Sequence, residues 1–322
     1  MANINDIAKK TGFSKSTISR YLNKGSVSKA TSDKIKAAID ELGYVPNKFA
    51  QSLKSSSSKT IGVVIPNFYG FSKNMALDAI NSYLSTTEYT MLLSSSNNNS
   101  IREIEILEEM VRLNVDGVIL FASKISSEHK KFFKSIDIPL LIYGQEVKGE
   151  HCICVDDYAS GVLMGDYIKS LNHKEISYLD VGSFDKAVRK RFKGLSDSLE
   201  NSPIKINHHL VNFKKEKAYD KILEIFDKEQ ASFYIGATDN IAFGIINALT
   251  SMGIKIPENI SVAGFGDYDI SSMVAPSLTT VRFPYSRSGL VAIEYMLKLI
   301  SGESIEKETL LKGSLIVRNS SK

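Results

Sequence analysis

The chain has 322 residues, 43% hydrophobic and 24% charged, an ordinary composition for a globular protein long enough for two or three domains. It contains no apolar run of about eighteen residues and no signal-peptide pattern, so we expect neither a membrane span nor export, and predict a cytoplasmic protein. The net charge is +4, but residues 1–60 hold ten lysines and Arg20 against four carboxylates, which makes them +7 and the remainder −3. A basic segment on a mildly acidic body favours a module that binds a polyanion.

The first 45 residues predict three short helices. An asparagine near position 3 can cap the first helix, and Ser14 can cap the second. We expect Thr31 to cap the third helix and Gly43 to end it. This arrangement is typical of a helix–turn–helix DNA-binding domain, which we assign to residues 1–45.

The second helix places its apolar residues, among them Ile18, on one face and its polar residues on the other. A major groove admits one helix, whose first residues reach the base edges. An arginine in that position can make a bidentate contact with guanine, typically worth ~1–3 kcal/mol of discrimination. We predict base contacts from Lys15, Ser16 and Arg20, and phosphate contacts from Thr17, Ser19 and Asn23.

Residues 46–60 predict a hinge helix followed by a serine-rich linker. Pro46 starts a helix well, but a helix this short is marginal in water and forms only against a partner surface. Ala50 and Leu53 lie three residues apart on one side, and Lys48 adds a positive charge for phosphates. Leu53 can wedge between base steps of a minor groove, or it can pack on the body of the protein.

Beyond residue 60 the pattern changes to apolar strands that alternate with helices. The strands are IGVVIP, TMLLSSS, GVILFA, PLLIYG, ISYLDV, SFYIGA and ISVAGFG, and helical stretches at 101–113, 158–171 and 240–252 separate some of them. Continuous apolar strands between helices predict parallel sheets covered on both faces. The number of units is too large for one sheet, so we expect two α/β lobes.

Open α/β sheets bind ligands beyond the carboxyl ends of their strands. On that rule the candidate ligand contacts are Asn67, Phe68, Phe71, Ser94, Gln145, Thr238, Asp239 and Asp267. Asp239 can also cap the helix that follows it.

Catalytic and metal sites are not predicted. The chain lacks G-x-G-x-x-G after the first strand, a P-loop and a G-x-S-x-G elbow, and Asp156 and Asp157 are expected to point to opposite faces of a strand. Cys152 and Cys154, with His151 beside them, are too few ligands for a metal site and are expected to be buried thiols. We therefore expect neither an enzyme nor a cofactor.

Several longer motifs resemble the LacI family of bacterial transcription regulators over essentially the whole chain. In the head they are DIAKKTGFSKSTISRYLN, the VS and T of SVSKATSDKI, GYVPN and AQSL; in the body they are VDDYASGVLMGDYIKSLNHKEISYL, RKRFKGL and the segment from ATDNIAFG to SLTTV. The resemblance implies backbone contacts to DNA from Ser28, Thr31, Tyr44 and Asn47 and a minor-groove insertion of Leu53 paired with that of a second subunit. It also implies that Arg191 holds ligand hydroxyls and that Phe213 stacks on the ligand.

The fold that the resemblance implies is a two-lobed periplasmic-binding-protein-like domain at residues 61–322. Lobe 1 would comprise about residues 61–155 and 286–312, and lobe 2 about residues 156–283 and 313–322. The chain departs from family patterns at Gly266, where many sugar-binding members carry aspartate, and at Ser160, where lactose-type repressors have an acidic residue.

The function that the resemblance implies is repression of a carbohydrate-utilisation operon, for sucrose or a related sugar. A sugar or sugar phosphate between the lobes would act as inducer or corepressor on binding to a palindromic operator. Paired leucine wedges and palindromic half-sites require a homodimer, and no leucine heptad follows LIVRNSSK to build a tetramer. The alternatives are a catabolite-control regulator that docks a phosphorylated phosphocarrier protein and, for the body alone, a sugar-transport protein.

Overall fold

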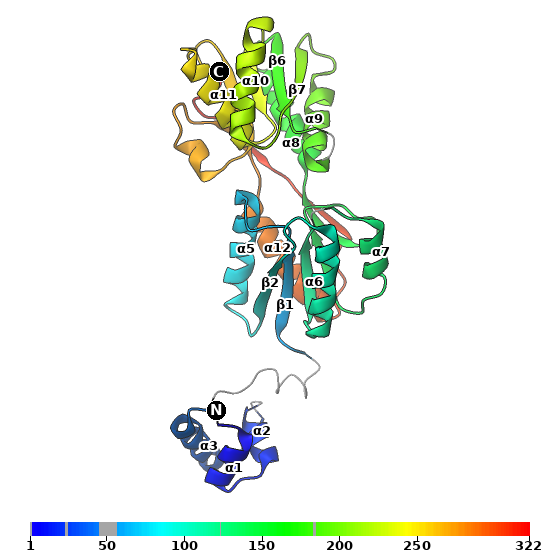
Figure 1. Ribbon diagram of the computed structural model, residues 1–322, viewed down its shortest axis with the longest axis vertical. Helices are drawn as coiled ribbons and strands as arrows, with labels where there is room; N and C mark the ends of the chain where they lie inside the picture. Colours follow the sequence, from blue (N-terminus) through cyan, green and yellow to red (C-terminus); the bar gives the residue numbers. More distant parts are fainter. Residues whose placement is uncertain (1, 23–24, 45–56, 123, 183–184) are drawn as a thin grey trace.

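The computed structural model describes residues 2–22, 25–44, 57–122, 124–182 and 185–322, which form a helical head and a two-lobed α/β body (Figure 1). In the head, α1 (Ile4–Thr11), α2 (Lys15–Leu22) and α3 (Lys29–Leu42) pack around one small core. The fully buried side chains of that core are Ile7, Ile18 and Ile35. Each helix contributes one of them, so the amphipathic spacing of all three helices converges on a single centre.

The caps of the head helices are mostly those that the sequence predicts. Asn3 caps α1 in a reciprocal arrangement with Asp6, and Gly43 ends α3 in a left-handed conformation. The prediction that Thr31 caps α3 is wrong. Ser28 is the cap, because α3 begins at Lys29 and the Ser28 hydroxyl accepts the Thr31 N–H at 3.2 Å.

Lobe 1 is built on a six-stranded sheet with all neighbours parallel and the strand order β11-β5-β4-β3-β1-β2. Its strands are β1 (Thr60–Ile65), β2 (Thr90–Ser95), β3 (Gly117–Phe121), β4 (Leu140–Tyr143), β5 (His151–Val155) and β11 (Glu308–Leu311). Its helices are α5 (Phe71–Leu84), α6 (Ser100–Arg112), α7 (Ser127–Phe133) and α12 (Tyr285–Ile300).

Lobe 2 repeats the architecture with the strand order β12-β10-β9-β8-β6-β7. Its strands are β6 (Glu175–Asp180), β7 (Lys205–Leu210), β8 (Phe233–Gly236), β9 (Ser261–Gly266), β10 (Thr279–Arg282) and β12 (Ser314–Ile316). Its helices are α8 (Asp157–Lys169), α9 (Lys186–Leu199), α10 (Lys215–Ile225) and α11 (Asp239–Ser251), with short 3-10 turns η1 (Phe226–Lys228) and η2 (Asp269–Ser272). The sheet departs from the expected parallel pattern at β12, which runs antiparallel to β10.

Helices cover both faces of the lobe 1 sheet, so the inner strands are apolar on both sides. One face packs against α5 and α12, and the other against α6 and α7. Strand β5 shows the alternation: Ile153 faces the first core, and Cys152 and Cys154 face the second as free thiols. Burial raises the pKa of both thiols, which keeps them protonated and unreactive at neutral pH.

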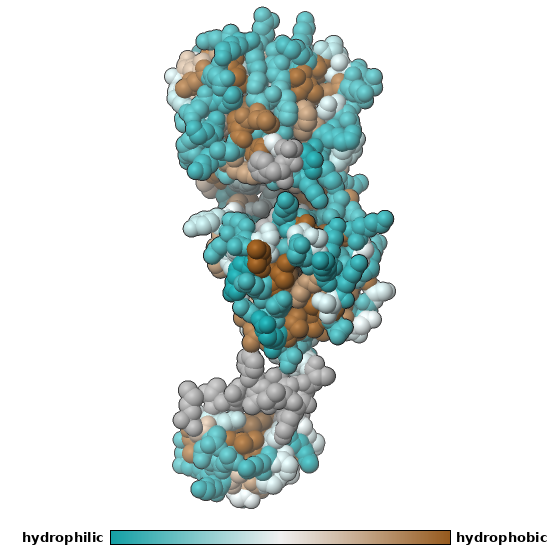
Figure 2. Space-filling view, turned by 45° about the vertical axis from the view of Figure 1, so that its right-hand side comes forward, coloured by the Kyte–Doolittle hydropathy of each residue, from teal (hydrophilic) through white to brown (hydrophobic). Residues whose placement is uncertain are grey.

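Three chain segments cross between the lobes, after β5, after β10 and after β11 (Figure 1). The molecule narrows where they pass (Figure 2). Within the described residues, no helix is both long and apolar enough to span a bilayer.

Candidate functional site

The outward face of α2 carries the residues predicted to read bases. Lys15, Ser16 and Arg20 are exposed, while Ile18 on the opposite side is completely buried. The Ser14 hydroxyl accepts the Thr17 N–H at 3.2 Å, which fixes the start of the helix. The packing of Ile18 therefore holds a rigid helix with its polar face towards solvent.

The remaining predicted DNA contacts lie on α2, at the start of α3, at the core of the head and outside the described residues. Thr17 and Ser19 are partly buried on α2, and Ser28 and Thr31 lie at the start of α3 with their hydroxyls 2.8 Å apart. The N-terminus of a helix favours a phosphate, so this placement suits a backbone contact. Tyr44 packs against the core of the head. Outside the described residues lie the predicted hinge helix and the side chains of Asn23, Asn47, Lys48, Ala50 and Leu53.

Arg191 is the centre of a second polar site, in lobe 2. Its helix α9 packs closely on α8. The glycine at position 161 of α8 permits this approach, since a Cβ atom there would lie only 2.0 Å from the Arg191 carbonyl oxygen. This approach brings Arg191 Nε to 2.7 Å from Asp157 Oδ1, while Nη1 donates to the Ala237 carbonyl at 2.8 Å. Burial by itself lowers the pKa of Arg191, but the charge of Asp157, its hydrogen bond to the guanidinium and the neighbouring tyrosines together outweigh burial, and the pKa is raised. The guanidinium is therefore held as a cation with 12% of its side chain exposed.

Two phenylalanine rings flank the guanidinium, and other aromatic rings connect the two lobes. Arg191 Cζ lies 4.6 Å from the centroid of the Phe283 ring, a cation–π geometry. The Phe71 ring of lobe 1 lies 5.0 Å from the Tyr268 ring of lobe 2 and 6.3 Å from the Tyr285 ring. Burial raises the pKa of Tyr268 to about 12, so its hydroxyl stays protonated. The junction thus combines a fixed cation with aromatic faces, a combination that suits sugar rings.

An ion pair provides a second direct contact between the lobes. Lys190, next to Arg191 on α9, pairs with Glu146 in the loop after β4. Both side chains are more than a third exposed, at 44% and 34%, so the pair is screened by solvent and weak.

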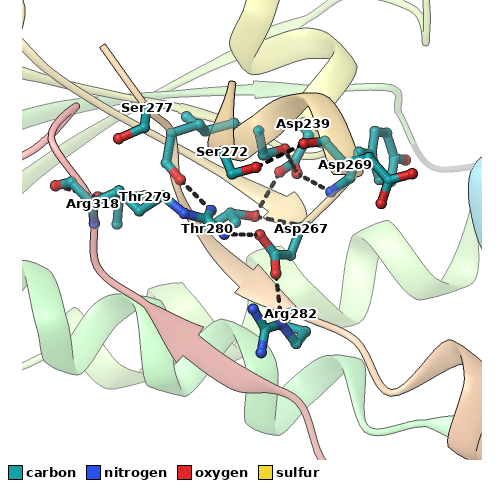
Figure 3. A network of polar contacts seen from close by, with 12 residues as sticks. Asp239, Asp267, Asp269, Ser272, Ser277, Thr279, Thr280, Arg282 and Arg318 are labelled. Carbon is teal, nitrogen blue, oxygen red and sulfur yellow. Dashed lines mark hydrogen bonds and ion pairs between the residues drawn. The ribbon is translucent and has the colours of Figure 1, made fainter. Parts of the chain in front are cut away.

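Asp239 is a buried acceptor within lobe 2 (Figure 3). Its carboxylate accepts the Thr280 hydroxyl at 2.6 Å, the Ser271 hydroxyl at 2.6 Å and the Tyr268 N–H at 3.0 Å. Burial raises the pKa of Asp239, and these hydrogen bonds oppose that rise. Thr238 rather than Asp239 caps α11. The network fixes the loop that carries Tyr268.

Asp267 is also engaged by its own lobe (Figure 3). Its carboxylate pairs with Arg282 Nε at 2.6 Å and with Arg318 Nη2 at 2.5 Å. Arg282 is the last residue of β10, directly before a crossover to lobe 1. Asp267 therefore ties the loop after β9 to a segment that connects the lobes.

The predicted contacts of lobe 1 lie at the carboxyl ends of its strands. Asn67 donates to Asn98 at 2.8 Å, and Gln145 donates to the Ala122 carbonyl at 2.8 Å. Ser94 lies near the end of β2, and Phe68 is 59% exposed in the loop after β1. Phe213 is exposed in the loop after β7 of lobe 2.

Two surface depressions lie elsewhere on lobe 2, with volumes of about 250 and 360 Å³. Asp197 lines the first and Lys217 the second. Neither is lined by a predicted ligand contact.

Two family models match separate parts of the chain. Residues 3–47 match the bacterial regulatory proteins of the lacI family, and residues 166–321 match the periplasmic binding protein-like domain. The sucrose operon repressor of Staphylococcus xylosus is 33% identical over 313 residues, which are 97% of this chain and 98% of that protein. The chain belongs to the LacI family. It is a DNA-binding transcriptional regulator with the helix–turn–helix head and two-lobed α/β body expected from its sequence.

Two further similarities cover the full length of this LacI-family chain. The transcriptional repressor PurR of Vibrio parahaemolyticus is 29% identical, covering 100% of this chain and 99% of that protein. The crystal structure of the lac repressor dimer bound to operator and the anti-inducer ONPF superposes with a TM-score of 0.90 at 23% identity, covering 99% and 98% of the two chains. At that identity the superposition establishes the fold.

The two departures from LacI-family patterns have structural explanations. Gly266 has φ 143°, and a Cβ atom there would lie 2.5 Å from the Tyr268 ring, so Tyr268 fills the space that a side chain at position 266 would need. Ser160 is buried and donates to the Asp156 carbonyl at 2.7 Å. It also lies beside the crossover at Gly313.

The sequence did not single out Asp157, Tyr268, Tyr285, Glu146 and Lys190 as site residues. Asp156 and Asp157 do face different partners, but the reason is helical: Asp156 caps α8, and Asp157 is its first residue. The signal that could have identified Asp157 is its position just after the apolar strand β5, since the rule that selected Asp239 also relies on residues that follow a strand. Tyr268 follows the apolar β9 in the same way.

Proposed function

We propose that this regulator represses an operon for the use of sucrose or a related sugar and that a sugar bound between the lobes changes its affinity for a palindromic operator. The observation that carries the proposal is the outward face of α2, where Lys15, Ser16 and Arg20 stand exposed on a helix fixed by a buried core. The similarity to a sucrose operon repressor supports the choice of sugar.

In the proposed complex α2 lies in the major groove. Arg20 contacts a guanine with both of its terminal nitrogens, and Lys15 and Ser16 contact neighbouring bases. Thr17, Ser19, Asn23, Ser28, Thr31, Tyr44, Asn47 and Lys48 contact the backbone, which sets position without reading sequence. Leu53, with Ala50 beside it, inserts in the minor groove together with the same leucine of a second subunit.

A homodimer follows from this arrangement, because two identical heads read two identical half-sites. The lac repressor, which shares the fold, is a dimer on its operator. Because the target is chromosomal DNA, we place the protein in the cytoplasm.

The sugar is proposed to bind where the lobes meet. Arg191 would donate to sugar hydroxyls, Phe71 and Phe213 would pack on the ring, and Asn67, Phe68, Ser94, Gln145 and Thr238 would line the lobe edges. Asp239 and Asp267 would act mainly by holding the Tyr268 loop, since their oxygens already accept two or three hydrogen bonds within lobe 2.

Binding of the sugar would be coupled to the head through the arrangement of the lobes. A ligand shifts such an equilibrium only by its difference in affinity for the two arrangements, commonly ~1–3 kcal/mol. The sugar would leave the protein unchanged, because the site is proposed to bind and not to catalyse.

The test begins by selecting duplexes from random DNA with the full-length protein. We expect a palindromic consensus, and we expect sucrose or a related sugar to raise the thermal midpoint and change the affinity for the selected duplex. Selection of no consensus would overturn the proposal for the head. A consensus with no response to any sugar or sugar phosphate would overturn the proposal for the effector, and release of sugar hydrolysis products would show an enzyme.

A further inference from the structure

Asp116 lies in the turn between α6 and β3 and binds the segment through which the chain enters lobe 1. Its Oδ1 accepts the Ser58 N–H at 2.7 Å and the Ser58 hydroxyl at 2.9 Å. Its Oδ2 accepts the Lys59 N–H at 3.2 Å and the Ser57 hydroxyl. Two oxygens of one carboxylate therefore hold three consecutive residues of the serine-rich run.

Other groups of lobe 1 fix the same segment. Lys59 has a left-handed backbone with φ 53°, which is uncommon for lysine and is maintained only by its surroundings. Its carbonyl accepts the Thr90 N–H at 2.8 Å, and the Asp116 N–H donates to the Thr60 carbonyl at 2.8 Å. The chain is thus bound to β2 and β3 at the amino ends of these strands, the edge of the sheet opposite the proposed sugar site.

We infer that Asp116 is a positioning residue that sets the point at which the linker to the head leaves lobe 1, so that operator affinity depends on this carboxylate. The inference rests on the proposed function. Residues 57–59 are polar and have no apolar side chain to bury, so hydrogen bonds must hold them, and the carboxylate of Asp116 accepts four of these. Release of three residues adds about 10 Å of reach to the linker. The distance between the two heads of a dimer would then be less fixed, although a palindromic site requires a fixed distance.

Two variants test the inference, and one variant serves as the control. Asp116→Asn replaces one acceptor oxygen by a donor that faces other donors. Ser57→Ala/Ser58→Ala removes two hydroxyl donors and leaves Asp116 and the β1–β3 pairing intact, which keeps the test valid if Asp116→Asn misfolds. Glu105→Gln makes the same change of charge on the exposed face of α6, where Glu105 pairs with Arg102 at 3.0 Å.

The first measurement is hydrogen exchange of the Ser58 and Lys59 amides in the full-length protein without DNA. Both amides donate to Asp116, so we expect faster exchange in Asp116→Asn and wild-type exchange in Glu105→Gln. Unchanged exchange in Asp116→Asn would overturn the inference whatever the protein does with DNA.

The second measurement is affinity for the duplex that the wild-type protein selects from random DNA. We expect a loss of about tenfold in both test variants, equivalent to about 1.4 kcal/mol, with the salt dependence unchanged because the phosphate contacts of the head remain. Faster amide exchange with wild-type affinity would overturn the inference while leaving the proposed function intact. Failure of the wild-type protein to select any duplex would instead refute the proposed function, on which the inference depends.

Discussion

The head and the proposed sugar site of lobe 2 use their polar residues in different ways. On α2, Lys15, Ser16 and Arg20 are exposed around a buried Ile18. In lobe 2, the charged groups of Arg191, Asp239 and Asp267 are bonded to neighbours within their own lobe. Substitutions on the outer face of the head should therefore change DNA binding without changing stability. Single substitutions of these charged groups in lobe 2 should change both sugar binding and stability.

The largest expected effect concerns the Arg191–Asp157 pair. Arg191→Met leaves Asp157 without its cation at a site where both side chains are nearly buried, at 12% and 11% exposed. Loss of one partner of a buried pair costs about 3–5 kcal/mol, so we expect a large fall in the free energy of unfolding, measured by urea denaturation.

The double variant Arg191→Met/Asp157→Leu separates stability from ligand binding. Replacement of both charges by apolar groups is often nearly neutral for stability, so we expect unfolding close to wild type together with loss of the thermal shift caused by sugar. A stable double variant with the full thermal shift would show that Arg191 does not bind the sugar.

The second prediction concerns the head. Arg20→Ala should lower affinity for the selected duplex by about 1–3 kcal/mol and relax the preference at one base position, with the free energy of unfolding unchanged. Selection from random DNA and urea denaturation measure the two properties. Lys36→Ala removes the same charge from the exposed side of α3 and should keep the base preference. A preserved preference in Arg20→Ala would show that α2 does not read the site through this side chain.

The third prediction concerns the rings that join the lobes. Phe71→Leu and Tyr268→Leu should each weaken sugar binding, and a double-mutant cycle on sugar affinity should give a coupling energy of about 0.5–1.5 kcal/mol. Calorimetric titration of the four proteins measures it. A coupling energy of zero would mean that the contact at 5.0 Å between the ring centroids does not contribute to sugar binding.

The smallest expected effect is that of the Lys190–Glu146 pair. Its partners are exposed, so Glu146→Gln should change sugar affinity by about 0.2–1 kcal/mol at low salt, and raised salt should remove the difference. The free energy of unfolding of the full-length protein should change by no more than the same small amount. A larger effect that persists at high salt would show that the ion pair excludes solvent in the sugar-bound form.

Much of the fold could be predicted from the sequence because apolar periodicity reports burial directly. The seven apolar runs correspond to strands β1, β2, β3, β4, β6, β8 and β9. Strand β7, with the sequence KINHHL, was not predicted, because an edge strand with polar side chains on its surface lacks a continuous apolar pattern. The capping residue of α3 was misassigned because serine and threonine three residues apart are both plausible caps, and only the backbone decides between them.

The outer face of α2 was predictable because a helix fixes which residues share a side. The proposed sugar site was less predictable, because its side chains form hydrogen bonds with partners far away in the chain. Asp239 is bonded to Ser271 and Thr280, and no local pattern announces such a pairing. Likewise, the serines at 57 and 58 resemble a plain spacer until the distant Asp116 is placed beside them.

The most direct test of the link between the two regions is the dissociation constant of the full-length protein for its selected duplex, measured with and without a saturating sugar that raises the thermal midpoint. We expect the constant to change by about 5–150-fold in the wild-type protein and to remain unchanged in Arg191→Met/Asp157→Leu. Equal constants with and without a sugar that demonstrably binds would contradict the proposal that lobe 2 controls the head.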